Sequence, residues 1–163
     1  GRSTLYRLVG NREDLLAIVL AAATERTFRR TVADMAAEAG SDTEPPGGTE
    51  YILAVMDRFL NAVVDAKPLQ AVSQREPLLI VRLMLLPGLV EQTAGRLVGE
   101  LLDAEVAAGR MELPLPTATF GLALIRMCDA HLYAPLLGGG APEIGTALDL
   151  VAALLGHSQS GEG

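Results

Sequence analysis

The chain has 163 residues, of which 50% are apolar and 20% charged, and its formal net charge is −7. This length is enough for one domain with a hydrophobic core, and the apolar content excludes a chain that is disordered throughout. Aromatic residues make up only 4%, Trp is absent, and Ala, Leu and Val dominate, so we expect an all-helical (all-α) fold.

The charge is unevenly distributed along the chain. Residues 1–30 hold six Arg against three acids, a net charge of +3, whereas the remaining residues hold seven bases and seventeen acids, a net charge of −10. A small basic head therefore precedes a large acidic body. A nucleic acid would be attracted to the head and repelled by the body.

The first long helix is predicted over residues 12–38. Asn11 can cap it, Asp14 can return the bond in a capping box, and Gly40 ends it. The stretch GSDTEPPGG that follows predicts a loop, because tandem Pro and Gly cannot continue a helix.

The remaining helices are separated by Pro and Gly. A helix from Thr49 or Glu50 ends before Lys67-Pro68, and a short polar helix or turn lies near residues 69–74. Glu76-Pro77 predicts the next start, and Pro87-Gly88 interrupts that helix. Further helices are expected over residues 89–108, 117–137 and 142–156.

The last two helices are apolar almost all round, so they must be covered on more than one side. We expect a second copy to supply part of the cover, as a four-helix contact in a homodimer. The predicted interface residues are Leu124, Leu132, Leu148, Val151 and Leu155. The apolar run 78–90 is too short to span a bilayer and contains Arg82, so we expect a buried helix and no membrane partner.

The single cysteine and the two histidines give little support for catalysis. Cys128 and His131 share a helix face, but a zinc site needs ligands that the sequence does not supply. A buried thiol beside a hydrogen-bonded His is the alternative. We therefore expect no enzyme activity, no catalytic residue, no metal and no cofactor. With one cysteine and no signal-peptide pattern, the expected compartment is the cytoplasm.

The polar opening STLYRLVGNREDLL has the chemistry of a DNA-reading helix. In a helix over residues 2–8, Arg2, Ser3, Tyr6 and Arg7 face one way, where they can contact base edges and phosphates. Arg12, at the start of the next helix, suits a backbone phosphate. A basic surface helix with no DNA partner is the alternative.

This opening also resembles the end of the helix-turn-helix domain in TetR-family transcriptional regulators. The matching residues are Thr4, Tyr6, Gly10, Arg12, Glu13 and Leu15, with Val9 in place of the family's aromatic residue and Arg12 in place of its Lys. In that family two helices precede the recognition helix, and these residues do not include them. Residues 130–156 further resemble the C-terminal part of a QsdR-like subgroup.

The resemblance implies the end of a DNA-binding domain at residues 1–24, a ligand-binding and dimerisation domain at 25–158, and a tail at 159–163. It implies a homodimer on a palindromic operator, most simply a repressor that a small apolar effector releases, with Thr4 among the DNA-binding residues. The alternative is a helical dimer that binds a small molecule without binding DNA.

Candidate effector-binding residues are apolar side chains of the predicted helices and the few polar ones among them. Met56, Phe59, Leu83 and Met127 fit a pocket lining, although each also fits a simple core. Arg82 must pair with an acid, reach solvent or meet a ligand anion, and His131 is a second polar candidate. Arg126 and Asp129, three residues apart, are expected to pair with each other.

Overall fold

A computed structural model describes residues 1–4, 11–40 and 47–159, and these residues form helices without any strand. This confirms the all-α prediction. The helices, in chain order, are α2 (Arg12–Ala39), α3 (Gly48–Val64), α4 (Lys67–Arg75), α5 (Pro77–Leu85), α6 (Leu89–Ala107), α7 (Thr117–Tyr133), the 3-10 helix η1 (Ala134–Gly138) and α8 (Ile144–Gln159).

Helix α2 begins and ends where the sequence predicts. The Asn11 side chain accepts from the Asp14 amide and the Asp14 carboxylate accepts from the Asn11 amide, each at 3.1 Å. This is the predicted capping box, which satisfies two amide donors that a helix start would otherwise leave without partners. Gly40, with φ 69°, ends the helix in a conformation that other residues rarely adopt. The loop predicted at 40–48 lies mostly outside the described residues.

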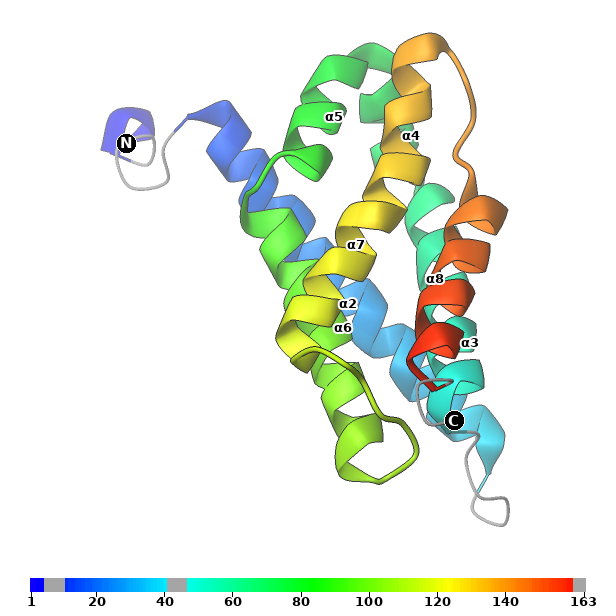
Figure 1. Ribbon diagram of the computed structural model, residues 1–163. Coiled ribbons are helices and arrows are strands. Elements are labelled where there is room, and N and C mark those ends of the chain that lie inside the picture. The colour runs from blue at the N-terminus through cyan, green and yellow to red at the C-terminus, as the bar shows by residue number, and fades with distance from the viewer. Residues whose placement is uncertain (5–10, 41–46, 160–163) are drawn as a thin grey trace.

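The long helix α2 connects the N-terminal end of the molecule to the opposite end of the bundle, and α6 lies along it (Figure 1). Near the middle of α2, Phe28 packs edge-on against Phe59 of α3, with ring centroids 5.2 Å apart. Both rings are almost completely buried. Such burial of a large apolar side chain contributes about 1.5–3 kcal/mol, so this contact anchors α2 to the body.

Helices α6 and α7 pack closely because glycines face each other between them. A methyl group added at Gly121 would lie 2.5 Å from the Gly99 nitrogen and 2.7 Å from the Gly95 oxygen. No real Cβ atom tolerates such distances to backbone, so only glycine allows the two helices to approach this far.

Short breaks separate the helices in the middle of the chain. Glu76 ends α4 and precedes Pro77 at the start of α5, as predicted. The Pro87-Gly88 break bends the axis between α5 and α6 by 47°. These bends place α5 beside both α2 and α7 at the end of the bundle nearest the N-terminus (Figure 1).

The segment Thr117–Gly138 is long and apolar enough, by composition, to cross a membrane, with a mean hydropathy of 1.2. In the bundle, however, Leu124, Ile125, Cys128 and Leu132 of this segment are at most 1% exposed. They pack against neighbouring helices of the same chain. The segment is therefore a core helix, and its last residues tighten into η1 rather than continuing α7 to residue 137 as predicted.

Candidate functional site

The first turn of α2 is tied to the body by two ion pairs. Arg12 donates to both carboxylate oxygens of Glu76, at 2.6 and 3.1 Å. Its neighbour Glu13 accepts from Arg82 of α5. Arg12 was predicted to contact a DNA phosphate, and Arg82 to pair with an acid, reach solvent or meet a ligand anion. Both pair with acids in this structure, and Arg82 is more than half exposed. Their contacts to DNA and to a ligand stay predictions.

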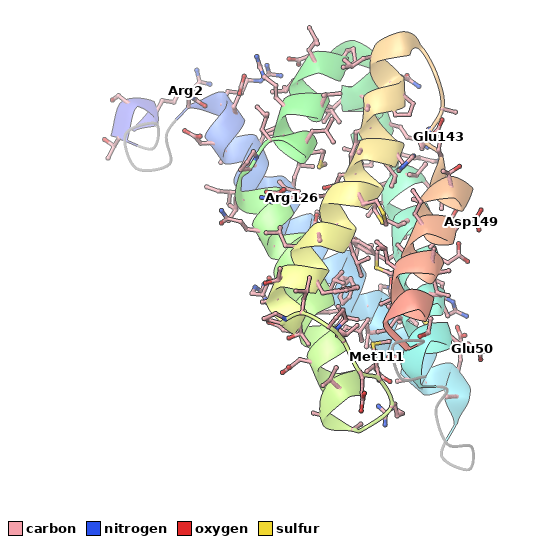
Figure 2. The ribbon with its side chains drawn as sticks, in the orientation of Figure 1. Arg2, Glu50, Met111, Arg126, Glu143 and Asp149 are labelled. Atoms are coloured by element: carbon pink, nitrogen blue, oxygen red, sulfur yellow. The ribbon has the colours of Figure 1, made fainter. Side chains whose placement is uncertain are left out.

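The described part of the predicted DNA-reading segment is exposed. Arg2, Ser3 and Thr4 are helical and lie at the solvent-facing N-terminal end, where Figure 2 shows Arg2 apart from the bundle. Tyr6 and Arg7 lie outside the described residues. The prediction that this segment binds DNA stays a prediction, and among its described residues Arg12 is the one whose side chain pairs with another residue of the chain.

The apolar residues predicted to bind an effector are mostly core. Met56 is completely buried and Phe59 is 3% exposed, whereas Leu83 and Met127 are half-buried. Four cavities of the described residues are lined by other side chains: two lie along α2 and α6, one lies between α6 and α7, and one lies between α3, α4 and the end of α7. The packing therefore favours the alternative interpretation of these four residues, that they belong to the core.

The predicted pair between Arg126 and Asp129 is wrong. Arg126 Nε donates to Glu91 Oε1 of α6 at 2.5 Å, and Glu91 is only 3% exposed. Arg126 points from α7 toward α6 in Figure 2. Burial, and then the charge of Glu91, raise the pKa of Asp129 well above its ordinary value. His131, the other polar candidate, lies 3.1 Å from Glu143.

Cys128 lacks the surroundings of a reactive thiol. It is completely buried, and burial raises the pKa of the thiol to about 12. A nucleophilic or metal-binding cysteine needs the opposite shift. Among the described residues, no three His, Cys, Asp or Glu side chains are grouped so that they could hold a metal ion.

The largest of the four cavities lies between α2, α3 and α6, with a volume of about 560 Å³. It is at the end of α2 farthest from the N-terminal segment (Figure 1). Its lining residues are Val32, Met35, Ala36, Glu38, Ala39, Tyr51, Arg58, Leu101, Ala104, Glu105 and Arg110. Cavities of this size hold small organic ligands, so this is the candidate effector site.

An ion pair between the buried Glu105 and the partly exposed Arg110 closes one side of this cavity. Arg110 Nε and a terminal guanidinium nitrogen each donate to Glu105 at 2.8 Å, and Glu105 is only 3% exposed. Glu105 Oε2 also accepts a hydrogen bond from the buried amide of Gly48, at 2.7 Å. This bond caps the start of α3. The hydrogen bonds from Arg110 lower the pKa of Glu105. The carboxylate therefore stays charged and joins α3 to the end of α6.

A second ion pair lies across the cavity. Arg58 of α3 donates to both oxygens of Glu38 at the end of α2, at 2.8 and 2.5 Å. Tyr51, on the turn of α3 near Glu105, also lines the cavity. None of these residues was predicted to be functional. Two features of the sequence could have pointed to this site. One is a single Tyr in an apolar helix, and the other is acids that have no base three or four residues away with which to pair.

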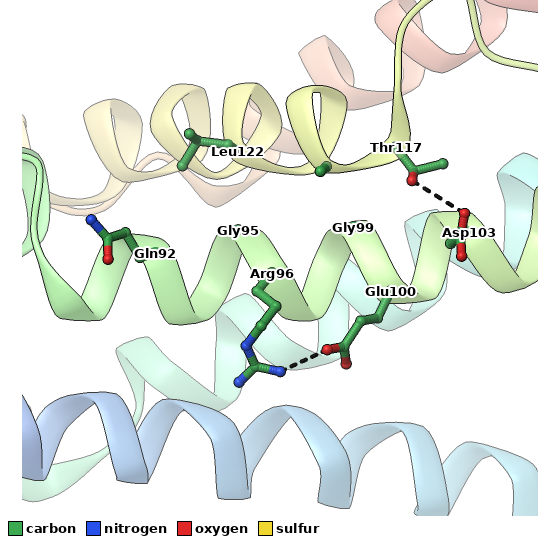
Figure 3. Close-up of a pocket in the computed structure, with 9 residues that line it drawn as sticks. Gln92, Gly95, Arg96, Gly99, Glu100, Asp103, Thr117 and Leu122 are labelled. Carbon is green, nitrogen blue, oxygen red and sulfur yellow. Dashed lines mark hydrogen bonds and ion pairs between the residues drawn. The ribbon is translucent and has the colours of Figure 1, made fainter.

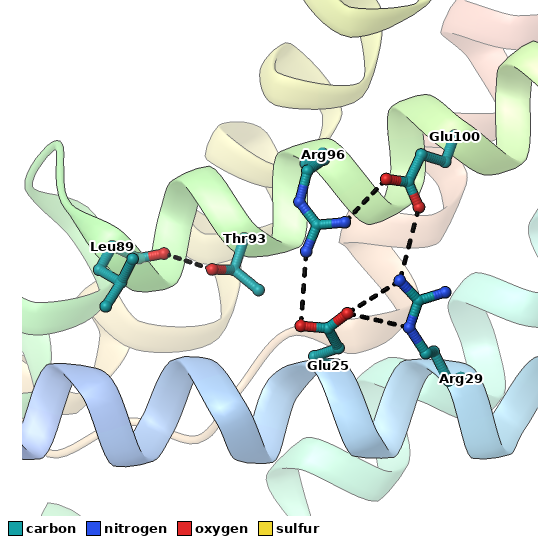
Figure 4. Close-up of polar contacts among 6 residues, drawn as sticks. All are labelled: Glu25, Arg29, Leu89, Thr93, Arg96 and Glu100. Atoms are coloured by element: carbon teal, nitrogen blue, oxygen red, sulfur yellow. Dashed lines mark hydrogen bonds and ion pairs between the residues drawn. The ribbon is translucent and has the colours of Figure 1, made fainter.

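A network of exposed charges joins α2 to α6 along the same groove. Arg29 contacts Glu25 at 2.8 Å and Glu100 at 3.8 Å, and Arg96 contacts Glu100 at 2.7 Å and Glu25 at 3.5 Å. Figure 4 shows the four side chains closing a ring between the two helices.

A shallower cavity of about 380 Å³ lies on the opposite side of α6, against α7 (Figure 3). Gly95 and Gly99 form part of its floor, and Thr117 donates to Asp103 at 3.3 Å at one end. Gly95 and Gly99 are also the residues that Gly121 of α7 approaches closely. The cavity therefore lies beside the close helix contact, and none of the predicted effector-binding residues lines it.

Four of the five predicted dimer-interface residues lie inside a single chain. Leu124, Leu132, Val151 and Leu155 are completely buried, whereas Leu148 is half-buried. A side chain with no exposed area cannot contact a second copy without rearrangement. The large apolar side chains that α8 exposes are instead Leu150, at 38%, and Leu154, at 44%.

Comparisons with known proteins agree with this architecture. Residues 47–156 match the family described as "Tetracyclin repressor-like, C-terminal domain". The structure of the R. erythropolis transcriptional repressor QsdR, from the TetR family, is 46% identical in sequence and superposes with a TM-score of 0.84. That match covers 96% of this chain and 78% of the QsdR chain. This chain belongs to the TetR family.

The TetR assignment confirms the resemblance seen in the sequence, including the QsdR-like subgroup. The family consists of transcriptional regulators, in which DNA binding and ligand binding reside in separate parts of the chain. The matched C-terminal domain begins at the start of α3. No curated protein sequence is significantly similar to the chain. The domain boundary predicted at residue 24 falls within the continuous helix α2.

Proposed function

We propose that this TetR-family protein is a ligand-responsive repressor, released from its operator when a small molecule enters the body. One observation carries the proposal: α2 is a single uninterrupted helix of 28 residues. Its first turn follows the basic segment, and its last turns line the largest cavity. From Arg12 to Met35 the helix extends about 35 Å at 1.5 Å per residue, so a shift at the cavity moves its other end.

The contacts at the two ends of α2 give this shift a physical basis. At the N-terminal end, Arg12 and Glu13 pair with Glu76 and Arg82 around α5. At the other end, Glu38 pairs with Arg58 of α3. A ligand that binds better when α2 is displaced from α3 and α6 would favour that position. By the same linkage, it would weaken the operator complex.

We propose a homodimer whose two recognition helices meet a palindromic operator about one DNA turn apart, in the cytoplasm. The outer face of α8 supports an interface there, because Leu150 and Leu154 are exposed four residues apart on one stripe. The buried residues first predicted for the interface would then pack beneath this exposed face of α8. Leu150→Glu should yield a monomer in sedimentation. Leu78→Glu is the matched control, because Leu78 on α5 is also an exposed leucine, at 66%, and this variant should remain a dimer.

The DNA-binding test uses the full-length protein and fluorescence anisotropy with its own upstream region. Arg2 is exposed, and loss of an Arg contact to a base edge costs about 1–3 kcal/mol, or roughly a 5- to 150-fold loss of affinity. Arg30→Ala is the matched control, because Arg30 is an exposed Arg on α2 paired only weakly with Asp34 at 3.7 Å.

The expected result is specific binding that Arg2→Ala weakens and Arg30→Ala does not. Equal affinity for the upstream region and a random duplex, at moderate salt, would contradict the proposal. It would favour the alternative of a dimeric small-molecule-binding module without DNA binding. Catalysis is not part of the proposal, because the buried Cys128 and the paired His131 leave no activated nucleophile among the described candidates.

A further inference from the structure

The cavity between α2, α3 and α6 continues into a second cavity along the same two helices. The neighbour has a volume of about 350 Å³ and is lined by Phe28, Arg29, Val32, Ala33, Ala36, Leu97, Glu100, Leu101 and Ala104. Four of these residues, Val32, Ala36, Leu101 and Ala104, also line the larger cavity. We call the two together the α2–α6 trough. Its shared floor is entirely apolar, which suits an elongated hydrocarbon group.

Every charged group on the trough is matched by an opposite charge. The larger cavity has the acids Glu38 and Glu105 and the bases Arg58 and Arg110, which pair with one another. At the other end, Arg29 pairs with both Glu25 and Glu100. A charged group that lay on the apolar floor would leave water without gaining a free counter-ion, or would break one of these pairs, and both are costly.

One polar group of the trough has no such partner. The Tyr51 hydroxyl makes no hydrogen bond to any part of the chain that the structure describes, although it lines the larger cavity. Burial raises the pKa of Tyr51, so the phenol stays neutral at physiological pH. It can donate or accept one hydrogen bond.

We propose that the α2–α6 trough binds an uncharged amphiphile, whose hydrocarbon part lies on Val32, Ala36 and Leu101 and whose single polar group hydrogen-bonds Tyr51. Only the claim that this ligand acts as the effector rests on the proposed function. Binding itself follows from the cavity's shape and its balanced charge. Met56, Phe59 and Leu102 fill the centre of the body, where each is at most 3% exposed.

The test compares three probes with the same hydrocarbon chain and different end groups: 1-octanol, octanoate and octylammonium. Binding is measured by titration calorimetry and by the NMR shift of the Met35 methyl group, which lines the cavity. We expect 1-octanol to bind at least about tenfold more tightly than either ion, because the ions lack a free counter-charge. An ion that binds as tightly as 1-octanol would overturn the proposal.

Two variants locate the probe. Ala36→Leu fills the shared floor and should weaken 1-octanol binding by more than about tenfold. Ala22→Leu is the matched control on an exposed face of the same helix and should leave binding unchanged. Tyr51→Phe removes only the hydroxyl and should weaken binding about fivefold, as loss of one neutral hydrogen bond does. The same change at Tyr133, near the other end of the bundle, should have no effect.

Unchanged binding in Ala36→Leu, with helicity intact by circular dichroism, would place the ligand elsewhere and overturn the proposal. Unchanged binding in Tyr51→Phe would show that the ligand makes no hydrogen bond to Tyr51 and would overturn that part of the proposal. These measurements contain no DNA, so they are independent of the proposed repressor function. If 1-octanol binds as expected but no operator is bound, the proposed function fails and the trough remains a ligand site.

Discussion

Glu105 should be among the most costly side chains of the body to remove. It is 3% exposed, it accepts two hydrogen bonds from Arg110 at 2.8 Å, and it accepts one from the Gly48 amide at 2.7 Å. Glu105→Ala leaves the buried amide without a partner and the guanidinium without its carboxylate. Removing one partner of a buried ion pair typically costs about 3–5 kcal/mol.

The expected loss lies at the lower end of that range. The Arg110 side chain is 41% exposed and can turn toward water, so its share of the penalty is small. The unsatisfied Gly48 amide alone costs about 1–3 kcal/mol. We therefore expect the free energy of unfolding to fall by about 3 kcal/mol, which lowers the melting temperature by about 6–12 °C for a chain of this size.

The assay is urea denaturation at pH 7 and pH 3. Because the pKa of Glu105 is lower in the folded than in the unfolded state, its stabilisation is complete above the ordinary value of 4.5. It is lost as the pH falls through the folded-state pKa. The difference between wild type and Glu105→Ala should therefore be largest at pH 7 and shrink at pH 3. Glu105→Gln, which keeps an acceptor for Gly48, should lose less.

The matched control is Glu100→Ala on the same helix. Glu100 is about half exposed and its ion pairs are screened by water, so its removal should change stability little. The reasoning would be refuted if Glu105→Ala destabilised the protein no more than Glu100→Ala. It would also be refuted if the loss at pH 3 equalled the loss at pH 7.

Three further predictions follow from the packing and the charges. Gly121→Ala should lower the free energy of unfolding by about 1–3 kcal/mol, because the new methyl group meets the backbone of α6. Gly156→Ala, in open space on α8, should raise it by about 0.5–1 kcal/mol. Calorimetry should therefore show a lower melting temperature for the first variant and a higher one for the second. Asp129→Asn should raise stability at pH 7 and not at pH 3, because a raised folded-state pKa makes ionisation costly only above the ordinary value of 3.8; an equal gain from the exposed Asp149→Asn would argue against this cause. Arg82→Gln should speed hydrogen exchange in the first turn of α2 while leaving global stability nearly unchanged, and protection equal to wild type would show that this ion pair does not hold the turn.

The sequence by itself determined the helices and the family. Asn11 with Asp14 defines the start of α2, and Pro77 and the Pro87-Gly88 break mark α5 and α6, because caps and breaks depend on residues within one turn. The TetR resemblance likewise rested on a contiguous motif. Composition favoured helices over strands without any knowledge of packing.

Only the tertiary structure decided which side chains meet. Arg82 pairs with Glu13 and Arg12 with Glu76, which are 69 and 64 residues away in sequence, whereas spacing along one helix suggested the wrong partner for Arg126. Helices α7 and α8 are apolar on most sides, so periodicity could not separate Leu124 and Val151, which face their own core, from Leu150, which faces solvent. The cavity beside Tyr51 was invisible for the same reason: an empty space exists only where side chains from several helices fail to fill it.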